Sequence, residues 1–343
     1  MTNWTIRIAE EKDAKRWDAF VDELRGGPYF YWSWKKAVEK AYGHKGLYLL
    51  IERGYEILGI LPLILLRFPL KRPLLVSLPF CDYGGILARE DAILQILFSK
   101  AHQIKDKIGA LRLELRFPKP EVMPFISSKQ EPIQKVRLIL ALPQTPDELW
   151  KSFKSKVRSQ IRRPKKEGAE VVTGGLELLP IFYQIYLENM HYLGSPAHSL
   201  RWFKEVVGNF AERARIVVVY KDYLPLASGI ILLSADTVTV PWAASRRAYK
   251  RISPNMLLYW QFLSFAADHG FKYFDFGRST PGGGTYRFKK QWGAEPVPLF
   301  WYSDPQVPEQ VSRIRPLAER VWQKLPPGLV NRLGPQIRRY ISL

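Results

Sequence analysis

The sequence predicts an α+β (α/β) protein with mixed, mostly antiparallel sheets, arranged as two similar units in tandem and followed by a helical tail. The chain of 343 residues is long enough for two domains, which commonly hold about 100–200 residues each. The strand–turn–strand pattern of Leu49–Leu65, with Gly59 early in its second strand, recurs at Val217–Leu232 with Gly229. Each copy follows two helical segments and precedes further strands. A duplicated unit explains this pattern, although two similar hairpins also arise by chance.

The expected boundaries lie near residues 145 and 304. We expect a first domain over residues 1–145, a second over residues 146–304 and a basic helical tail over residues 305–343. The tail holds an apolar stripe with steps of three and four residues, made of Val311, Ile314, Ala318, Val321 and Leu325. Its basic residues Arg313, Arg320 and Lys324 lie mostly off that stripe. Such a helix either packs on its own domain or lies on an anionic membrane.

The first domain is expected to open with a strand and two helices and to continue mainly with strands. The expected strands are Trp4–Ala9, Leu47–Glu52, Glu56–Phe68, Leu74–Leu78, Leu111–Arg116 and Val136–Leu142. The expected helices are Lys12–Leu24, Trp32–Ala41 and Asp91–Lys107. The first two helices are separated by Gly26, Gly27 and Pro28, which break helices, and Pro118–Pro132 is typical of a loop.

The second domain is expected to hold more helix. The expected helices are Pro146–Phe153, Lys156–Lys166, Leu179–Leu193, Ser199–Arg213, Pro254–His269 and Tyr286–Trp292. The expected strands are Arg215–Tyr220, Ala227–Ser234, Thr237–Ala243, Tyr273–Phe276 and Pro298–Tyr302. Ser199 and Ser253 are expected to cap the helices that follow them, because a serine hydroxyl accepts a hydrogen bond from a free helical N–H.

Charge and residue usage exclude several classes of protein. The net charge of +20 favours polyanionic partners. The single cysteine excludes a disulfide framework and a cysteine-based metal site, and the five scattered histidines do not match a zinc hydrolase. No apolar signal core is present at the start, and the longest apolar run, Ile57–Leu66, is too short to span a bilayer. We therefore expect a cytoplasmic protein with no metal site.

Two basic segments are candidate anion sites. Lys151–Lys166 holds eight cations and no acid, among them Arg158, Arg162 and Arg163, and like charges four residues apart repel unless an anion binds. The alternative is a solvated basic face. The second segment is a loop before the helix that begins at Pro254, and its cations are Arg246, Arg247, Lys250 and Arg251. A helix N-terminus attracts phosphate, although this loop could also be simply exposed.

The third candidate is the glycine-rich segment Phe274–Pro296. Asp275 lies between aromatic residues of a short strand, where a carboxyl group can act as a general base. The alternative is a structural ion pair with Arg278. The cations Arg278, Arg287, Lys289 and Lys290 follow closely, and the further candidates for binding are Arg278, Tyr286, Phe288 and Lys290. The glycines do not fit a P-loop, which ends in Gly-Lys-Ser/Thr.

Five motifs together resemble the FemAB family, in particular its subgroup found with exopolysaccharide and exosortase gene clusters. They are LPFCDYGGILA, KVRSQIRRPKKEG, SPNMLLYW, FDFGRST and GTYRFKKQWGAEP. The resemblance covers roughly residues 5–303. It implies two tandem GNAT-type acyltransferase domains, and it places the pair Phe288 and Lys289 beside the point of acyl transfer. The long helical arm of some Fem proteins and the GNAT pyrophosphate loop are both absent from this sequence.

The resemblance implies an N-acyltransferase that moves an aminoacyl or acyl group onto an amine of a cell-envelope, peptidoglycan or exopolysaccharide precursor. The co-substrate would be acyl-CoA or aminoacyl-tRNA, with no tightly bound cofactor. Lys289 could stabilise the oxyanion and Asp275 could serve as a base. The expected partners are a phosphorylated or lipid-linked acceptor, tRNA, and the anionic inner face of the cell membrane. A non-catalytic protein that binds RNA or another polyanion on a degenerate GNAT scaffold is the alternative.

Overall fold

The computed structural model describes residues 4–118, 135–306 and 310–342, and for residues 310–315 the backbone alone. The chain forms two compact units. Unit 1 comprises Met1–Val136, Val297–Ser312 and Arg339–Leu343, and unit 2 comprises Arg137–Pro296 and Arg313–Arg338. The loop expected over Pro118–Pro132 falls almost entirely outside the described residues.

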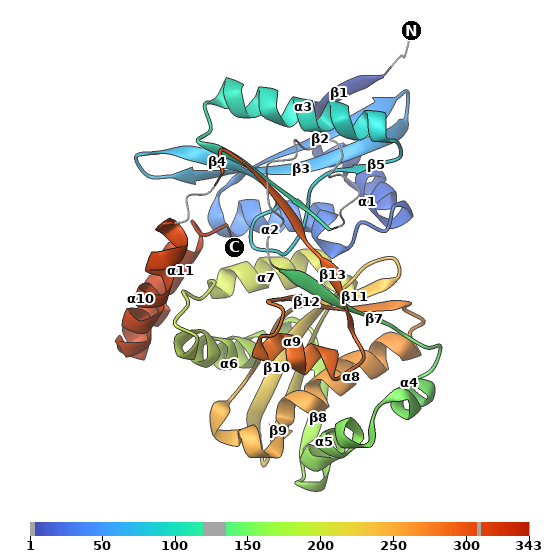
Figure 1. Cartoon of the computed structure of the whole chain (residues 1–343), viewed down its shortest axis with the longest axis vertical. Coiled ribbons are helices and arrows are strands. Elements are labelled where there is room, and N and C mark those ends of the chain that lie inside the picture. The colour runs from blue at the N-terminus through green and yellow to red at the C-terminus, as the bar shows by residue number, and fades with distance from the viewer. Residues whose placement is uncertain (1–3, 119–134, 307–309, 343) are drawn as a thin grey trace. The chain divides into compact units, whose positions relative to one another are not determined.

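Unit 1 is built on a sheet with the strand order β1-β2-β3-β4-β6-β14, and a short β5 also pairs with β3. These strands are β1 (Thr5–Ile8), β2 (Lys45–Arg53), β3 (Glu56–Phe68), β4 (Lys71–Ser77), β5 (Leu87–Ala88), β6 (Arg112–Phe117) and β14 (Phe300–Asp304). Along the main path neighbours are antiparallel except for β4 and β6, which run parallel. Helix α3 (Asp91–Ile108) makes that crossover and covers one face, while α1 (Ala14–Glu23) and α2 (Trp32–Tyr42) lie on the other (Figure 1).

Unit 2 repeats this plan with the strand order β8-β9-β10-β11-β12-β7-β13. Its strands are β7 (Val136–Ala141), β8 (Glu170–Gly174), β9 (Ala214–Lys221), β10 (Leu224–Leu233), β11 (Thr237–Ser245), β12 (Tyr273–Ser279) and β13 (Glu295–Pro298). The strands from β8 to β11 are antiparallel, and β11 and β12 are parallel. Helix α8 (Pro254–Asp268) makes the crossover, and α6 (Leu179–Tyr192) and α7 (Leu200–Phe210) precede the β9–β10 hairpin.

The duplication expected from the sequence is confirmed by the strand order, by the position of the parallel pair and by the two glycines. A side chain at Gly59 of β3 would lie 2.6 Å from Ile93 of α3. A side chain at Gly229 of β10 would lie 2.9 Å from Phe262 of α8. Each glycine therefore makes room for the crossover helix of its own unit, which is why both hairpins carry it at the same place.

Two strands join a different sheet from the one that the expected boundaries imply. Val136–Ala141, placed before the boundary at residue 145, belongs to the sheet of unit 2 as β7. Phe300–Asp304, placed in the second domain, pairs antiparallel with β6 in unit 1 as β14. Phe300 and Tyr302 pack on the core of unit 1, and Tyr302 meets Phe98 of α3 edge to face. An alternating strand pattern shows which side chains are buried but not which sheet receives them.

Of the two serine caps expected from the sequence, one is confirmed and one is wrong. Ser199 caps α7, since its Oγ accepts a hydrogen bond from Trp202 N at 3.1 Å. Ser253 precedes α8 in the left-handed conformation, with φ 62°, and its side chain makes no capping hydrogen bond. β8 and β13 were not expected, because each is short and polar at several positions.

The remaining helices are α4 (Pro146–Ser152), α5 (Ser155–Lys166), α9 (Gly284–Lys290), α10 (Gln310–Lys324) and α11 (Pro327–Arg338). The apolar stripe expected on α10 is not buried as a whole, since Val321 and Ala318 are exposed. The side chains of Val311 and Ile314 lie outside the described residues. Among the helices that the structure describes, none is long and apolar enough to cross a membrane.

Candidate functional site

The parallel strands β11 and β12 pair over only three residues, from Thr237 with Tyr273 to Thr239 with Asp275. β11 continues along β10 to Ser245, with an irregularity in register between Ile230 and Leu232 of β10. Pro241 lies two residues after Thr239, the last residue of β11 that pairs with β12. A proline has no N–H to donate to a neighbouring strand. Beyond this point β12 runs on to Ser279 without pairing with β11. The two strands therefore diverge after Thr239 and Asp275, and diverging strands of this kind can hold an extended ligand between their edges.

The matching place in unit 1 is closed by the chain itself. β4 pairs with β6 up to Ser77, and Gly84 N then donates to Arg116 O of β6 at 2.8 Å. The buried Arg116 guanidinium donates to Leu78 O at 2.9 Å and to Ser342 O at 3.1 Å. The edge after the parallel pair is therefore occupied in unit 1, and the candidate site lies in unit 2.

Asp275, the last residue of β12 that pairs with β11, is fully buried and bound from two sides. Its Oδ2 accepts hydrogen bonds from Nε and Nη2 of Arg137 on β7, at 2.9 and 2.8 Å. Its Oδ1 accepts one from Gly277 N at 2.8 Å. Gly277 has φ 72°, a left-handed conformation that glycine adopts without strain. The carboxylate thus fixes the bend of β12, and the expected alternative of a pair with Arg278 is replaced by a pair with Arg137.

Lys289 of α9 is also buried and holds the same part of β12. Its Nζ donates to Gly277 O at 3.0 Å and to Arg278 O at 2.9 Å. One ammonium group thereby binds two carbonyl oxygens of β12 in the part that no longer pairs with β11. Lys289 and Asp275, both candidates from the segment Phe274–Pro296, therefore bind the backbone of Gly277, one at its carbonyl oxygen and the other at its N–H.

An aromatic cluster joins α8, α9 and β12. Tyr259 of α8 stacks on Phe276 with ring centroids 5.6 Å apart, and it meets Phe288 of α9 edge to face at 5.0 Å. Burial raises the pKa of Tyr259, so the phenol stays protonated. Trp292 closes the cluster against Phe153 after α4. Phe288 is half-buried, so the residue that the FemAB resemblance places at the transfer point forms one wall of this cluster.

The basic loop between β11 and α8 holds two arginines that contact side chains of α6 and two further cations that are exposed. Arg246 forms an ion pair with Glu188 of α6 at 2.9 Å. The Arg247 guanidinium lies 3.4 Å from the ring centroid of Tyr192. Lys250 and Arg251 are exposed. Lys250 and Arg251 are therefore better placed than Arg246 to meet an anion.

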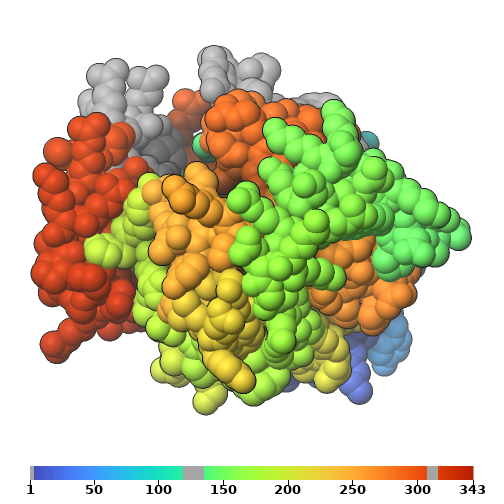
Figure 2. Space-filling model, turned by 90° about the horizontal axis from the view of Figure 1, so that it is seen from below, coloured from blue at the N-terminus to red at the C-terminus, as the bar shows by residue number. Residues whose placement is uncertain are grey.

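Helix α5 lies at the surface of the molecule (Figure 2), and it packs through its apolar side while several of its cations are exposed. Val157, Ile161 and Pro164 are buried, and α5 contacts α8. Arg163 is exposed, Arg158 is half-buried, and the exposed Arg162 lies 5.1 Å from the Trp150 ring centroid. The remaining candidates on α9 are Tyr286, which is half-buried, and Lys290, which pairs with Glu295 at 2.8 Å.

Sequence reasoning missed Arg137 and Tyr259. Arg137 is a single cation in the otherwise apolar strand β7, and a buried cation needs an anionic partner. That anomaly was the available signal, but nothing in the sequence pairs it with a residue 138 positions later. Tyr259 sits in the mainly apolar helix α8 and shows no signal beyond its aromatic character.

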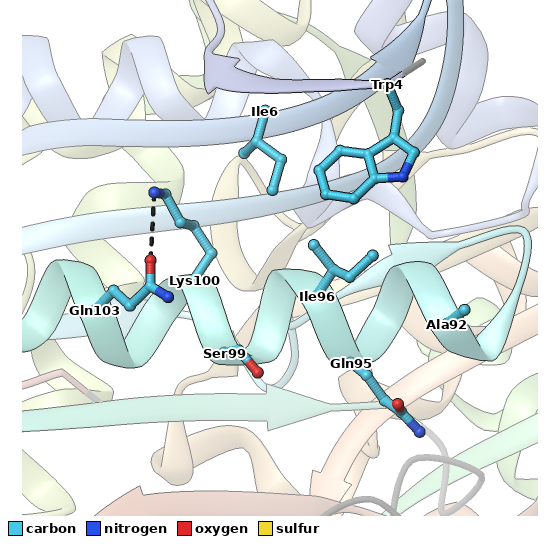
Figure 3. A pocket seen from close by; sticks show the side chains of 8 residues that line it. All are labelled: Trp4, Ile6, Ala92, Gln95, Ile96, Ser99, Lys100 and Gln103. Carbon is cyan, nitrogen blue, oxygen red and sulfur yellow. Dashed lines mark hydrogen bonds between the residues drawn. The ribbon is translucent and has the colours of Figure 1, made fainter. Parts of the chain in front are cut away.

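A hollow of about 510 Å³ lies in unit 1 (Figure 3). Trp4 and Ile6 lie on one side of it, and residues of α3 that include Ile96 and Lys100 lie on the other. Lys100 Nζ donates to Gln103 Oε1 at 3.4 Å. The hollow belongs to the unit whose parallel strands are closed, and it forms no part of the candidate site.

Residues 151–290 match the family model of an acetyltransferase (GNAT) domain. Unit 2 carries a GNAT acyltransferase domain. The matched segment holds β8 to β12 with the crossover helix α8, and it contains every candidate site residue named from the sequence. No curated protein sequence matches the chain.

Solved structures extend the similarity to both units. The crystal structure of FemX aligns with a TM-score of 0.68 at 15% identity and covers 92% of this chain and 100% of FemX. The C-terminal domain (DUF2156) of a putative lysylphosphatidylglycerol synthetase from Agrobacterium fabrum aligns with a TM-score of 0.57 at 9% identity, over 84% and 91%. A tandem GNAT protein from the clavulanic acid biosynthesis pathway aligns with a TM-score of 0.54 at 10% identity, and the alignment covers 88% of this chain and 98% of that protein. The expected tandem, FemAB-like GNAT fold is confirmed.

Proposed function

We propose that this GNAT acyltransferase moves an aminoacyl or acyl group onto an amine of a cell-envelope or exopolysaccharide precursor. The observation that carries the proposal is the early separation of β11 from β12. It leaves two strand edges at which an extended thioester or ester donor can be held by backbone hydrogen bonds. The carbonyl carbon of such a donor is then fixed for attack by a second substrate, which lowers the entropic part of the barrier.

The donor would be acyl-CoA or aminoacyl-tRNA, since both carry phosphates next to the acyl arm. The exposed Lys250 and Arg251 precede the N-terminus of α8, where free N–H groups and the helix dipole favour an anion. The basic side of α5 offers further cations, among them Arg162 and Arg163. Their number suits a donor with several phosphates or a phosphorylated acceptor.

The chemistry is addition of the amine nitrogen to the donor carbonyl. A C–N bond forms, the C–S bond of a thioester or the C–O bond of an aminoacyl ester breaks, and a proton of the amine ends on the released thiol or hydroxyl. The developing oxyanion needs hydrogen-bond donors, and the strand edges supply backbone N–H groups for this purpose. No charged side chain has to act directly if the two substrates are well placed.

In this proposal Lys289 and Asp275 act as positioning residues. Both charged groups are already bound within the protein. Lys289 donates to two carbonyl oxygens of β12, and Asp275 accepts hydrogen bonds from Arg137 and from Gly277 N. They fix the bend of β12 at the point where it leaves β11. Phe288 would cover the donor from the side of α9.

The acceptor would be a phosphorylated or lipid-linked amine, and a peptidoglycan precursor is one such molecule. One structure with this fold is named as a putative lysylphosphatidylglycerol synthetase, which is in keeping with an aminoacyl donor and a lipid acceptor. The reaction would take place at the cytoplasmic side of the membrane, where such precursors and both donors meet.

The test is turnover by the full chain with mixed acyl-CoA or aminoacyl-tRNA donors and a panel of amines, read by mass spectrometry. Lys250→Gln with Arg251→Gln should raise KM for the donor by roughly 2- to 30-fold, since an exposed ion pair contributes about 0.2–1 kcal/mol. Lys45→Gln with Lys71→Gln, two exposed lysines of unit 1, is the charge-matched control. Tight polyanion binding without turnover of any donor would favour the non-catalytic alternative.

A further inference from the structure

The helices α10 and α11 expose apolar and basic side chains together. Among the described residues 17 large apolar side chains are exposed, and five of them belong to these two helices. They are Leu317 (65% exposed), Val321 (54%), Leu329 (43%), Leu333 (40%) and Ile337 (40%). We call these five and the exposed cations Arg320, Lys324 and Arg332 the tail surface. A helix pair that only packed on its own unit would bury such side chains.

The spacing places the two kinds of side chain on one face of each helix. On α10, Leu317, Arg320, Val321 and Lys324 stand at positions i, i+3, i+4 and i+7, which share a helix face. On α11 the same steps relate Leu329, Arg332 and Leu333, and Ile337 extends the row. Glu319 is the single acid of residues 316–338, and its position relative to Leu317 puts it on the opposite side of α10. The tail surface is therefore apolar and purely cationic.

The opposite sides of both helices contact the rest of unit 2. Gln323 Nε2 donates to Tyr192 O at 2.8 Å, and Arg338 Nε donates to His198 Nε2 at 3.1 Å. Gly334 of α11 is buried, and a side chain there would lie 3.0 Å from Ala197 N. These contacts fix which side of the helices faces outward, so the tail surface is preformed.

We propose that the tail surface docks this protein on an anionic phospholipid bilayer. Its apolar members are aliphatic, as suits the boundary between headgroups and acyl chains, whereas single-stranded nucleic acids are bound by stacking on aromatic rings. The cations stand beside them, where they can meet lipid phosphates. The helices lie on the bilayer and do not cross it. The docking does not depend on which reaction unit 2 catalyses.

The experiment is co-sedimentation of the full chain with vesicles of phosphatidylcholine, with and without 30% phosphatidylglycerol, at low and high salt. We expect binding to the anionic vesicles alone, and weaker binding at high salt. The variant Arg320→Gln, Lys324→Gln, Arg332→Gln should lose about 10²-fold in affinity, since each cation near an anionic surface contributes about a factor of five. Leu317→Gln with Leu329→Gln should lower binding at both salt concentrations.

The control is Lys45→Gln, Lys71→Gln, Lys107→Gln, which removes the same charge from exposed positions of unit 1. It should bind vesicles within about twofold of the unchanged chain. Equal losses in the control and the tail variant would show a nonspecific charge effect and overturn the proposal. So would a tail variant that loses tRNA binding while its vesicle binding is kept. Because all substituted side chains are exposed, the melting temperature of each variant should match that of the parent.

Discussion

Replacing Asp275 by asparagine separates a positioning role from a role as a base. The substitution keeps the shape but removes the charge that neutralises the buried Arg137, whose Nε and Nη2 lie 2.9 and 2.8 Å from Asp275 Oδ2. Breaking one side of a buried ion pair costs about 3–5 kcal/mol. For a unit of this size 1 kcal/mol corresponds to about 2–4 °C, so unit 2 should melt about 6–20 °C lower.

The assay is calorimetric melting of Asp275→Asn, Arg137→Met and the double variant, with turnover measured well below the lowest melting point. Arg137→Met should destabilise by a similar amount because it leaves the carboxylate unpaired. The double variant should be less destabilised than the sum of the two, by more than about 1 kcal/mol, because the residues act as a pair. If Asp275→Asn melts like the unchanged chain and yet loses turnover, Asp275 is a base and the positioning account is wrong.

Three further outcomes are expected. Lys289→Ala should lower stability by about 2–3 kcal/mol, because two strand carbonyls lose a charged donor. It should also lower turnover by on the order of 10²-fold, because a displaced β12 misplaces the donor. Unchanged stability would contradict this role. Gly229→Ala should destabilise by about 1–3 kcal/mol through overpacking, whereas Gly284→Ala, with open space around it, should stay within about 0.5 kcal/mol, both read by denaturant unfolding. Burial and Arg338 hold the pKa of His198 well below its ordinary value, so the unfolded chain takes up a proton that the folded chain does not. Stability should therefore fall between pH 7 and 5.5, and less steeply in His198→Gln; equal slopes would refute it.

The sequence predicts the duplicated fold well because the signals are local. A glycine in the second hairpin strand of each unit is needed wherever a helix crosses close above it, and Gly59 and Gly229 both meet that requirement. The helix starting at Pro254 is likewise marked by its own residues, although Ser253 adopts a left-handed conformation and does not cap it. Local chemistry identifies such elements without any knowledge of their partners.

The site is predicted less completely because its contacts join distant residues. The motif around Asp275 and Lys289 contains two residues that the structure brings together at Gly277, but the partner of Asp275 is Arg137, which precedes the whole GNAT segment in the chain. In the same way β14 follows the last strand of unit 2 in the chain and yet joins the sheet of unit 1. A periodic pattern shows that a strand is half-buried, and it does not encode the edge on which the strand is placed.

We propose that the donor lies between the separated ends of β11 and β12. Hydrogen–deuterium exchange of the full chain, with and without a saturating acyl-CoA or aminoacyl-tRNA donor, tests it most directly. We predict slower exchange of backbone amides in residues 240–245 and 276–279 when the donor is bound, and unchanged exchange at Leu74–Ser77 of β4 in unit 1. Protection confined to α5, or to unit 1, with residues 240–245 and 276–279 unchanged, would contradict the account.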